Sequence, residues 1–187
     1  MIFNKLTIPG VFEIILEPHV DQRGFFMRTF DKKIFKEQGL KTDWVQQNHS
    51  FSKNKFTVRG FHFQYPPFAE TKLLRVIQGE ILFTVIDLRK SSKTFGKWVQ
   101  VTISAEKKNM LYVPRGCSPC MCTLTTNCHL MYNVDNYYSP ENEDNFRWND
   151  PDLAIPWPVK DPEVISERDN KAKSFEEFVE LHGGIKL

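Results

Sequence analysis

Hydrophobic residues along the chain fall in short runs that alternate with polar residues, and many of the runs contain phenylalanine. Alternation with a period of two is typical of strands that bury one face. Runs of this length at intervals of roughly 8–12 residues, separated by turn residues, indicate a sandwich or a barrel. The predicted strands are residues 11–16, 25–30, 58–65, 72–77, 81–88, 98–103, 110–113, 121–124 and 130–134. The last two of these are expected to pair with each other.

Short helices are predicted outside the strands. Asp31 is a candidate N-cap for a helix that places Phe35 on its inner side. The segment Ser174-Phe175-Glu176-Glu177 has the spacing of a capping box. It is expected to open a terminal helix that ends at Gly183.

Composition and charge narrow the class of protein. A chain of 187 residues with 41% hydrophobic residues can form one domain with a sizeable core. We predict a single domain over residues 1–187, with a helical extension from about residue 163. The formal net charge is +2 with both signs mixed, so no basic field indicates a nucleic-acid partner. No apolar run approaches the roughly 20 residues of a membrane span, and no secretion signal is evident, so a cytoplasmic protein is expected.

The four cysteines all fall between Cys117 and Cys128. Cys117 and Cys120 have CxxC spacing, but Cys122 and Cys128 do not supply the second such pair that a structural zinc site usually has. Without a secretion signal, reduced cysteines buried in strands are the favoured interpretation.

The stretch Val58–Tyr65 carries the first candidate chemistry. Strict alternation puts His62 and Gln64 on one face and two phenylalanines on the other. His62 and Gln64 are then expected to face a cavity. Arg59 falls on the core face unless Gly60 marks a bulge, as a glycine within a strand often does. The structural alternative is an edge strand with one satisfied core histidine.

No metal or other cofactor is predicted. Jelly-roll proteins that bind a metal commonly supply two or three histidines and a carboxylate from inward-facing strand positions. Gln64 breaks the expected pair with His62, and Pro119 replaces a histidine in the turn predicted at Pro114–Pro119. The remaining histidines form no obvious ligand set.

From about Gly10 to Asp169 the chain resembles the dTDP-4-dehydrorhamnose 3,5-epimerase family. Many short segments match the family's motifs in the same order, and together they are far more specific evidence for the family than any single segment. The segments are Asp21-x-Arg23-Gly24-Phe25-Phe26, Gln46-Gln47-Asn48-x-Ser50, Arg59-Gly60-Phe61-His62-Phe63-Gln64, Lys72-Leu73, Gly79-Glu80, Asp87-Leu88-Arg89, Phe95-Gly96-Lys97-Trp98, Tyr132, Tyr138-x-Pro140-x-x-Glu143, Trp148-Asn149-Asp150-Pro151 and Ser166-Glu167-Arg168-Asp169.

The resemblance implies a mainly β fold: a double-stranded β-helix, or cupin-like jelly roll, with short peripheral helices. It implies a homodimer that needs no metal. The expected activity is an isomerase that inverts C3, C5 or both of a nucleotide-linked 4-keto-6-deoxysugar. The expected role is in the biosynthesis of deoxysugars for surface polysaccharides such as lipopolysaccharide.

The resemblance also implies the catalytic residues. His62 would remove a proton next to the substrate carbonyl, and Asp169 would orient its imidazole. Lys72 would stabilise the enolate oxygen, and Tyr132 would return a proton from the opposite face. Taken singly, Lys72 could instead be a surface lysine, Tyr132 a core tyrosine and Asp169 a helix cap after Ser166.

Further residues are implied as substrate contacts. Arg23 and Arg59 would hold the diphosphate, with Arg168 nearby, because guanidinium groups form paired charge-assisted bonds to phosphate oxygens. Tyr138 would stack on the nucleobase. The contacts implied are Arg23, Arg28, Arg59 and Arg168 among the arginines, and Gln46, Asn48, Tyr138 and Glu143 among the others.

The chain departs from the family pattern at three positions. Arg28 stands where the family usually has a glutamate, Pro119 replaces a histidine that usually contacts substrate, and Asn133 replaces a lysine. The changed charge at Arg28 is consistent with a different nucleotide, a modified sugar or inversion at one carbon. Two alternatives stay open: a 3,4-ketoisomerase, and a nucleotide-sugar-binding relative without turnover.

Overall fold

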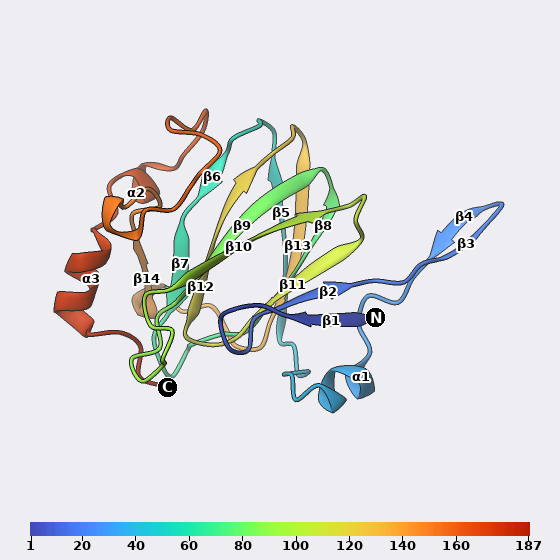
Figure 1. The fold of residues 1–187 in the computed structure, drawn as a ribbon, viewed down its shortest axis with the longest axis horizontal. Helices are drawn as coiled ribbons and strands as arrows, with labels where there is room; N and C mark the ends of the chain where they lie inside the picture. The colour runs from blue at the N-terminus through green and yellow to red at the C-terminus, as the bar shows by residue number, and fades with distance from the viewer.

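The computed structural model describes residues 1–187, whose strands form two main antiparallel sheets (Figure 1). The six-stranded sheet has the order β1 (Ile2–Lys5), β2 (Phe12–Ile15), β11 (Asn109–Val113), β8 (Lys72–Gln78), β13 (Cys128–Val134) and β5 (Gln46–Ser52). The four-stranded sheet has the order β10 (Trp98–Ser104), β9 (Glu80–Asp87), β12 (Cys117–Thr123) and β6 (Val58–Arg59). The consecutive strands β10, β11, β12 and β13 alternate between the two sheets. The predicted mainly β jelly-roll fold is confirmed.

Two small sheets and three α-helices surround this sandwich. β7 (Phe61–Gln64) pairs with β14 (Glu143–Phe146), and β3 (His19–Asp21) pairs with β4 (Gly24–Phe26). The β3–β4 hairpin projects away from the body of the protein (Figure 1). The helices are α1 (Lys32–Glu37), α2 (Glu167–Asn170) and α3 (Phe175–His182), with 3-10 turns η1 (Pro140–Asn142) and η2 (Pro151–Leu153).

The central core lies between the two main sheets. Leu74 and Leu130 of the six-stranded sheet share one buried cluster with Phe83, Val85 and Met121 of the four-stranded sheet. Burying a side chain of this size stabilises the fold by about 1.5–3 kcal/mol. The alternation of hydrophobic and polar residues that predicted these strands therefore also identifies the side chains that point into the core.

A second, aromatic core joins β7 and β14 to α3. Phe61 stacks on Phe146 with ring centroids 4.7 Å apart, and Phe63 meets Phe178 edge to face at 5.4 Å. All of these rings are buried. Aromatic pairs of this kind add to the burial of their area. The core fixes the C-terminal segment, which includes α2, against the strand that carries His62.

Two predictions about the strands near the chain's cysteines are wrong. Residues 121–124 and 130–134 do not pair: β12 bonds to β9 and β6, whereas β13 bonds to β8 and β5. The connection between them crosses from one sheet to the other. Pro119 lies within β12 rather than in a turn, and its partner in the ladder is Val85. β6 does not extend to Pro119, so the strand tolerates a residue without an N–H there.

Both helix caps are confirmed. The Asp31 carboxylate accepts from two backbone N–H groups in the first turn of α1, whose Phe35 is buried. Ser174 and Glu177 form the reciprocal capping box of α3, which ends at Gly183 with a φ of +60°. These caps bond helix N–H groups that have no partner inside the helix.

The cysteine prediction is also confirmed, since all four are free and buried. Burial raises the pKa of Cys117 to about 12 and that of Cys122 to about 11. Both are therefore thiols at neutral pH.

No helix in the structure has both the length and the apolar character needed to cross a membrane. The single domain over residues 1–187, its extension from about residue 163 and the cytoplasmic location stay predictions.

Candidate active site

Gly60 interrupts the strand that carries the candidate base. β6 ends at Arg59 and β7 begins at Phe61, so the alternation of side chains restarts between them. Arg59 and His62 consequently line one cavity, while Phe61 is buried in the aromatic core. The break in the strand expected at Gly60 is present, and it places Arg59 beside His62.

The cavity has a volume of about 180 Å³ and lies between the two main sheets. Its polar lining consists of Ser50, Arg59, His62, Lys72 and Tyr132, and its apolar lining of Leu74, Phe83, Pro119, Met121 and Leu130. A cavity with a few convergent polar groups on an apolar floor is typical of a small-molecule site.

His62 and Asp169 make the most specific contact in this site. His62 Nε2 lies 2.6 Å from Asp169 Oδ1, and Asp169 is 3% exposed. The Gly60 N–H donates to Oδ2 at 3.1 Å, and Asn145 Nδ2 donates to Oδ1 at 3.3 Å. Burial favours the neutral acid, but hydrogen bonds, above all from His62, lower the pKa of Asp169 to about 2. The carboxylate is therefore ionised, and the proton of the short bond belongs to Nε2 of His62.

The cap of α2 leaves the Asp169 carboxylate free for this contact. Ser166 is the N-cap residue, and its hydroxyl accepts from the Asp169 N–H at 3.1 Å. Asp169 is thus not itself the helix cap, which was the structural alternative to an orienting role.

Lys72 lies beside His62 at the start of β8. Its ammonium forms an ion pair with Glu70 at 3.0 Å and donates to the backbone oxygen of His62 at 3.3 Å. The Lys72 and Glu70 side chains are only 13% and 12% exposed. Lys72 is therefore not a surface lysine, and Glu70 fixes its ammonium at the wall of the cavity.

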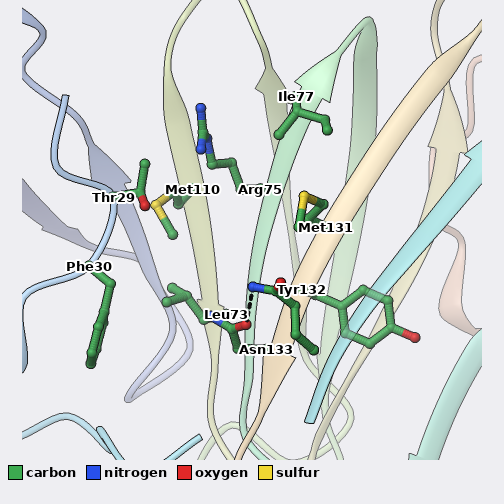
Figure 2. A pocket seen from close by; sticks show the side chains of 10 residues that line it. Thr29, Phe30, Leu73, Arg75, Ile77, Met110, Met131, Tyr132 and Asn133 are labelled. Carbon is green, nitrogen blue, oxygen red and sulfur yellow. Dashed lines mark hydrogen bonds between the residues drawn. The ribbon is translucent and has the colours of Figure 1, made fainter. Parts of the chain in front are cut away.

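Tyr132 reaches the same cavity from the six-stranded sheet. It stands on β13 opposite Asn48 of β5 and Leu74 of β8. Figure 2 shows the other side of β13, where Asn133 and Leu73 border a second pocket and the Tyr132 ring is turned away from them. Tyr132 and His62 thus enter one cavity from different sheets.

A polar cluster borders the same region on β14 and α2. Glu143 accepts from the Tyr138 hydroxyl at 2.9 Å and from Arg168 at 2.7 Å. The Gln46 side-chain oxygen accepts from the Tyr138 N–H at 2.9 Å. Because Arg168 directly precedes Asp169, the partner of His62, this cluster adjoins the His62–Asp169 pair.

Arg23 and Arg28 are not brought to this cavity within one chain. Arg23 belongs to the β3–β4 hairpin and pairs with Asp21 at 2.6 Å. Arg28 pairs with Asp31, the cap of α1, at 3.2 Å. Figure 1 shows the hairpin at one extreme of the protein and α2 at the opposite side. A single chain therefore leaves these two expected contacts apart from the others.

Gln64 does not face the cavity, contrary to the expectation from strict alternation. Its amide nitrogen donates to the backbone oxygens of Phe68 and Tyr137, and its oxygen accepts from the Ser139 N–H at 2.6 Å. Gln64 is 3% exposed. Its role is to tie β7 to two loops, because a buried amide must find partners for each of its polar atoms.

Two residues of the site were outside the sequence expectations. Asn145 lies on β14, in a polar, proline-rich segment whose pattern predicts no strand. Glu70 lies next to a loop that carries no motif of its own. Neither leaves a periodic signal, because each acts through a contact made only in the folded chain.

No group of three or more His, Cys, Asp or Glu residues is arranged to hold a metal ion. An activity that needs neither metal nor other cofactor stays a prediction.

Comparison with known proteins gives one consistent family. The sequence model described as dTDP-4-dehydrorhamnose 3,5-epimerase matches residues 5–177. A protein of that name from Shigella flexneri is 42% identical over 174 residues, which cover 91% of this chain and 94% of that protein.

Solved structures agree. The crystal structure of dTDP-4-dehydrorhamnose 3,5-epimerase from Bacillus anthracis, with TDP and PPi bound, has a TM-score of 0.89 and 38% identity, covering 92% of this chain and 98% of that one. A 3'-monoepimerase from Streptomyces bikiniensis, in complex with dTDP-quinovose, has a TM-score of 0.90 and 28% identity, covering 97% and 91%.

Proposed function

The chain belongs to the dTDP-4-dehydrorhamnose 3,5-epimerase family and is an isomerase of the epimerase type, and we propose that it inverts C3, C5 or both in a nucleoside-diphosphate-linked 4-keto-6-deoxyhexose. The observation that carries this proposal is the buried His62–Asp169 pair, which faces a cavity shared with Lys72 and Tyr132. In a 4-keto sugar the C3 and C5 protons are acidic, because the carbanion that forms is delocalised onto the carbonyl oxygen.

His62 is the base in this mechanism. Its Nε2 is bonded to the ionised Asp169, so Nδ1 is the nitrogen left to accept a proton from carbon. The imidazolium that forms is stabilised by the adjacent carboxylate. The C–H bond breaks, its electron pair becomes the enolate, and the proton resides on Nδ1.

Lys72 stabilises the enolate. The ammonium has three N–H bonds, and within the protein it contacts Glu70 and the His62 carbonyl oxygen. A preorganised cation directed at the oxygen where charge develops lowers the barrier without reorganisation.

Tyr132 is the acid that completes inversion. A neutral phenol can donate a proton to the basic enolate carbon, and Tyr132 enters the cavity from a different sheet than His62. Proton removal on one face and delivery on the other inverts the carbon.

The diphosphate and the base are bound at the rim. Arg59, which lines the cavity, and Arg168, which precedes Asp169, supply guanidinium groups, planar donors suited to phosphate oxygens. Tyr138, which is 57% exposed, offers a ring for stacking on the base. Gln46, Asn48 and Glu143 supply further polar contacts.

Arg23 and Arg28 reach a site only if the protein is a dimer. Phe26 of the β3–β4 hairpin is 68% exposed, and the six-stranded sheet exposes Phe51 as well as Ile77, which borders a pocket (Figure 2). Exposed apolar surface of this kind favours association. We infer a homodimer in which each hairpin carries Arg23 to the site of the partner subunit.

Mixing two inactive variants tests the dimer. Co-expressed His62→Ala and Arg23→Ala chains form a mixed dimer in which the Arg23→Ala subunit keeps its own His62 and receives an intact hairpin. Activity is expected to return in the mixed dimer. A mixture that stays inactive, although co-purification through an affinity tag on one of the two chains shows mixed dimers, would place Arg23 in its own subunit's site.

Deuterium exchange tests the function itself. Incubation in D2O with dTDP-, CDP- and GDP-linked 4-keto-6-deoxysugars, followed by NMR, is expected to show deuterium at C3 or C5 with the carbonyl still at C4. A carbonyl moved to C3 would identify a ketoisomerase, and the absence of any exchange would identify a binding protein.

A further inference from the structure

Asn145 contacts the His62–Asp169 pair from β14, the strand that begins at Glu143. It stands on β14 directly opposite His62 of β7 in the antiparallel register. Its Nδ2 donates to Asp169 Oδ1 at 3.3 Å, and this is the same oxygen that His62 Nε2 approaches at 2.6 Å. Two cross-strand neighbours thus hold one carboxylate oxygen of α2.

The environment of Asn145 indicates that its side-chain amide serves to bind the Asp169 carboxylate. The residue is 8% exposed, and its side chain makes a single hydrogen bond, the one to Asp169. Its strand neighbours turn elsewhere: Asp144 pairs with Lys173, and Phe146 packs in the aromatic core. A buried amide destabilises a fold unless it is hydrogen-bonded, so packing alone would favour an apolar residue.

We propose that Asn145 is a positioning residue for the reaction. It holds the Asp169 carboxylate in the orientation that fixes the His62 imidazole, and it lowers the basicity of that carboxylate toward the Nε2 proton. This inference rests on the proposed function. The carboxylate stands on a helix of four residues, α2, and could turn about its Cβ–Cγ bond. Gly60 bonds one oxygen and Asn145 the other, so donors on both sides fix its plane.

Because Asn145 and His62 share Asp169 Oδ1, replacing Asn145 has an effect that replacing a residue with only a packing role would not have. Each donor withdraws electron density from Oδ1, so removing Asn145 leaves a more basic carboxylate for the His62 N–H. The charged and titratable groups around the His62–Asp169 pair are Arg59 from β6, Lys72 from β8 with its partner Glu70, Cys120 from β12, Tyr132 from β13 and Arg168 from α2. None of these other groups is bonded to Asn145, so its replacement alters the pair alone.

Asn145→Leu tests the proposal in the full-length protein, since leucine keeps the shape of asparagine without its donor. We expect kcat to fall about 10-fold, KM to change less than twofold, and the acidic limb of the kcat/KM profile to move up by about half a pH unit. Asn145→Asp, which replaces the donor by an acceptor, is expected to move the limb further. If the leucine variant does not fold, Asn145→Ala gives the same comparison.

Tyr65→Phe is the matched control. Tyr65 donates to Asp144, the neighbour of Asn145 on β14, at 2.8 Å and does not touch Asp169. Its replacement weakens the same strand, and the acidic limb is expected to stay in place. Equal profiles for wild type and Asn145→Leu would overturn the proposal, as would an equal displacement in Tyr65→Phe.

A readout without substrate separates this inference from the proposed function. The ring nitrogens of His62 can be titrated by 15N NMR in wild type and Asn145→Leu. A displaced titration in the variant supports the positioning role even if no keto sugar is turned over. An identical titration overturns it even if the wild type is an active epimerase.

Discussion

His62 and Asp169 lie 107 positions apart in the chain, yet Nε2 of the histidine is 2.6 Å from Oδ1 of the carboxylate. The bond occupies Nε2, so in the proposed mechanism Nδ1 removes the substrate proton. His62→Ala is therefore expected to abolish deuterium exchange at both C3 and C5. NMR in D2O measures the exchange, and an unchanged melting temperature shows that the fold is intact. Near-normal exchange would remove His62 from the role of base.

Asp169→Asn is expected to reduce kcat by about 10²–10⁴-fold. The two carboxylate oxygens accept from His62 and from Gly60, and an amide can present an acceptor to only one of them. If its NH2 faces the imidazole, the ring carries its proton on Nδ1 and cannot act as a base there. Steady-state kinetics with the variant checks this, and a loss below threefold would contradict it.

Tyr132→Phe separates exchange from inversion. The variant keeps the ring that packs on the core but loses the transferable proton. It is expected to exchange substrate protons with solvent from the His62 face while returning mostly uninverted sugar. Loss of a general acid typically slows a reaction by about 10²–10⁴-fold, so inversion should fall much further than exchange. An unchanged ratio of the two would mean that the acid lies elsewhere.

Activity is expected to survive exhaustive chelation. Gln64, at the position where a metal-binding jelly roll would supply a second histidine, uses its amide to bond three backbone groups. Pro119, at the third such position, has no donor atom in its side chain. The test is the rate before and after dialysis against EDTA, with metal content measured by mass spectrometry. A stoichiometric metal whose removal stops turnover would contradict the expectation.

Acid is expected to destabilise the protein through Asp87. This residue is fully buried; burial would raise its pKa, but bonds from Arg89, Ser92 and Thr94 lower it to about 2. A carboxyl with a lowered pKa in the folded state contributes stability above its unfolded pKa of about 4, and loses it as the pH falls towards 2. The contribution at neutral pH is about 2 kcal/mol.

Urea unfolding at several pH values measures this effect. Asp87→Asn is expected to be less stable than wild type at pH 7, and the difference should shrink between pH 4 and pH 2. Asp21→Asn is the control, because Asp21 pairs with Arg23 on the exposed hairpin. It should unfold like wild type throughout. A constant difference for Asp87→Asn at all pH values would contradict the assignment.

The sequence by itself determined the features that depend on neighbouring residues. Asp31 and the Ser174–Glu177 box fix where two helices begin, because a cap needs only the residues of one turn. The alternation around His62 predicted its strand, and the ordered motifs indicated the family and the jelly roll.

The tertiary structure decided which distant residues meet. Strand pairing in a jelly roll is not set by order along the chain, so β12 and β13 lie in different sheets although they are consecutive. Gln64 turned from the cavity to two loops, and Asn145 joined Asp169 through a strand with no periodic signal. The β3–β4 hairpin, which carries Arg23, lies at the opposite side of the protein from β7 and α2, because a local motif does not specify where its hairpin docks. Contacts between distant segments depend on how the whole chain packs, and no local pattern encodes that packing.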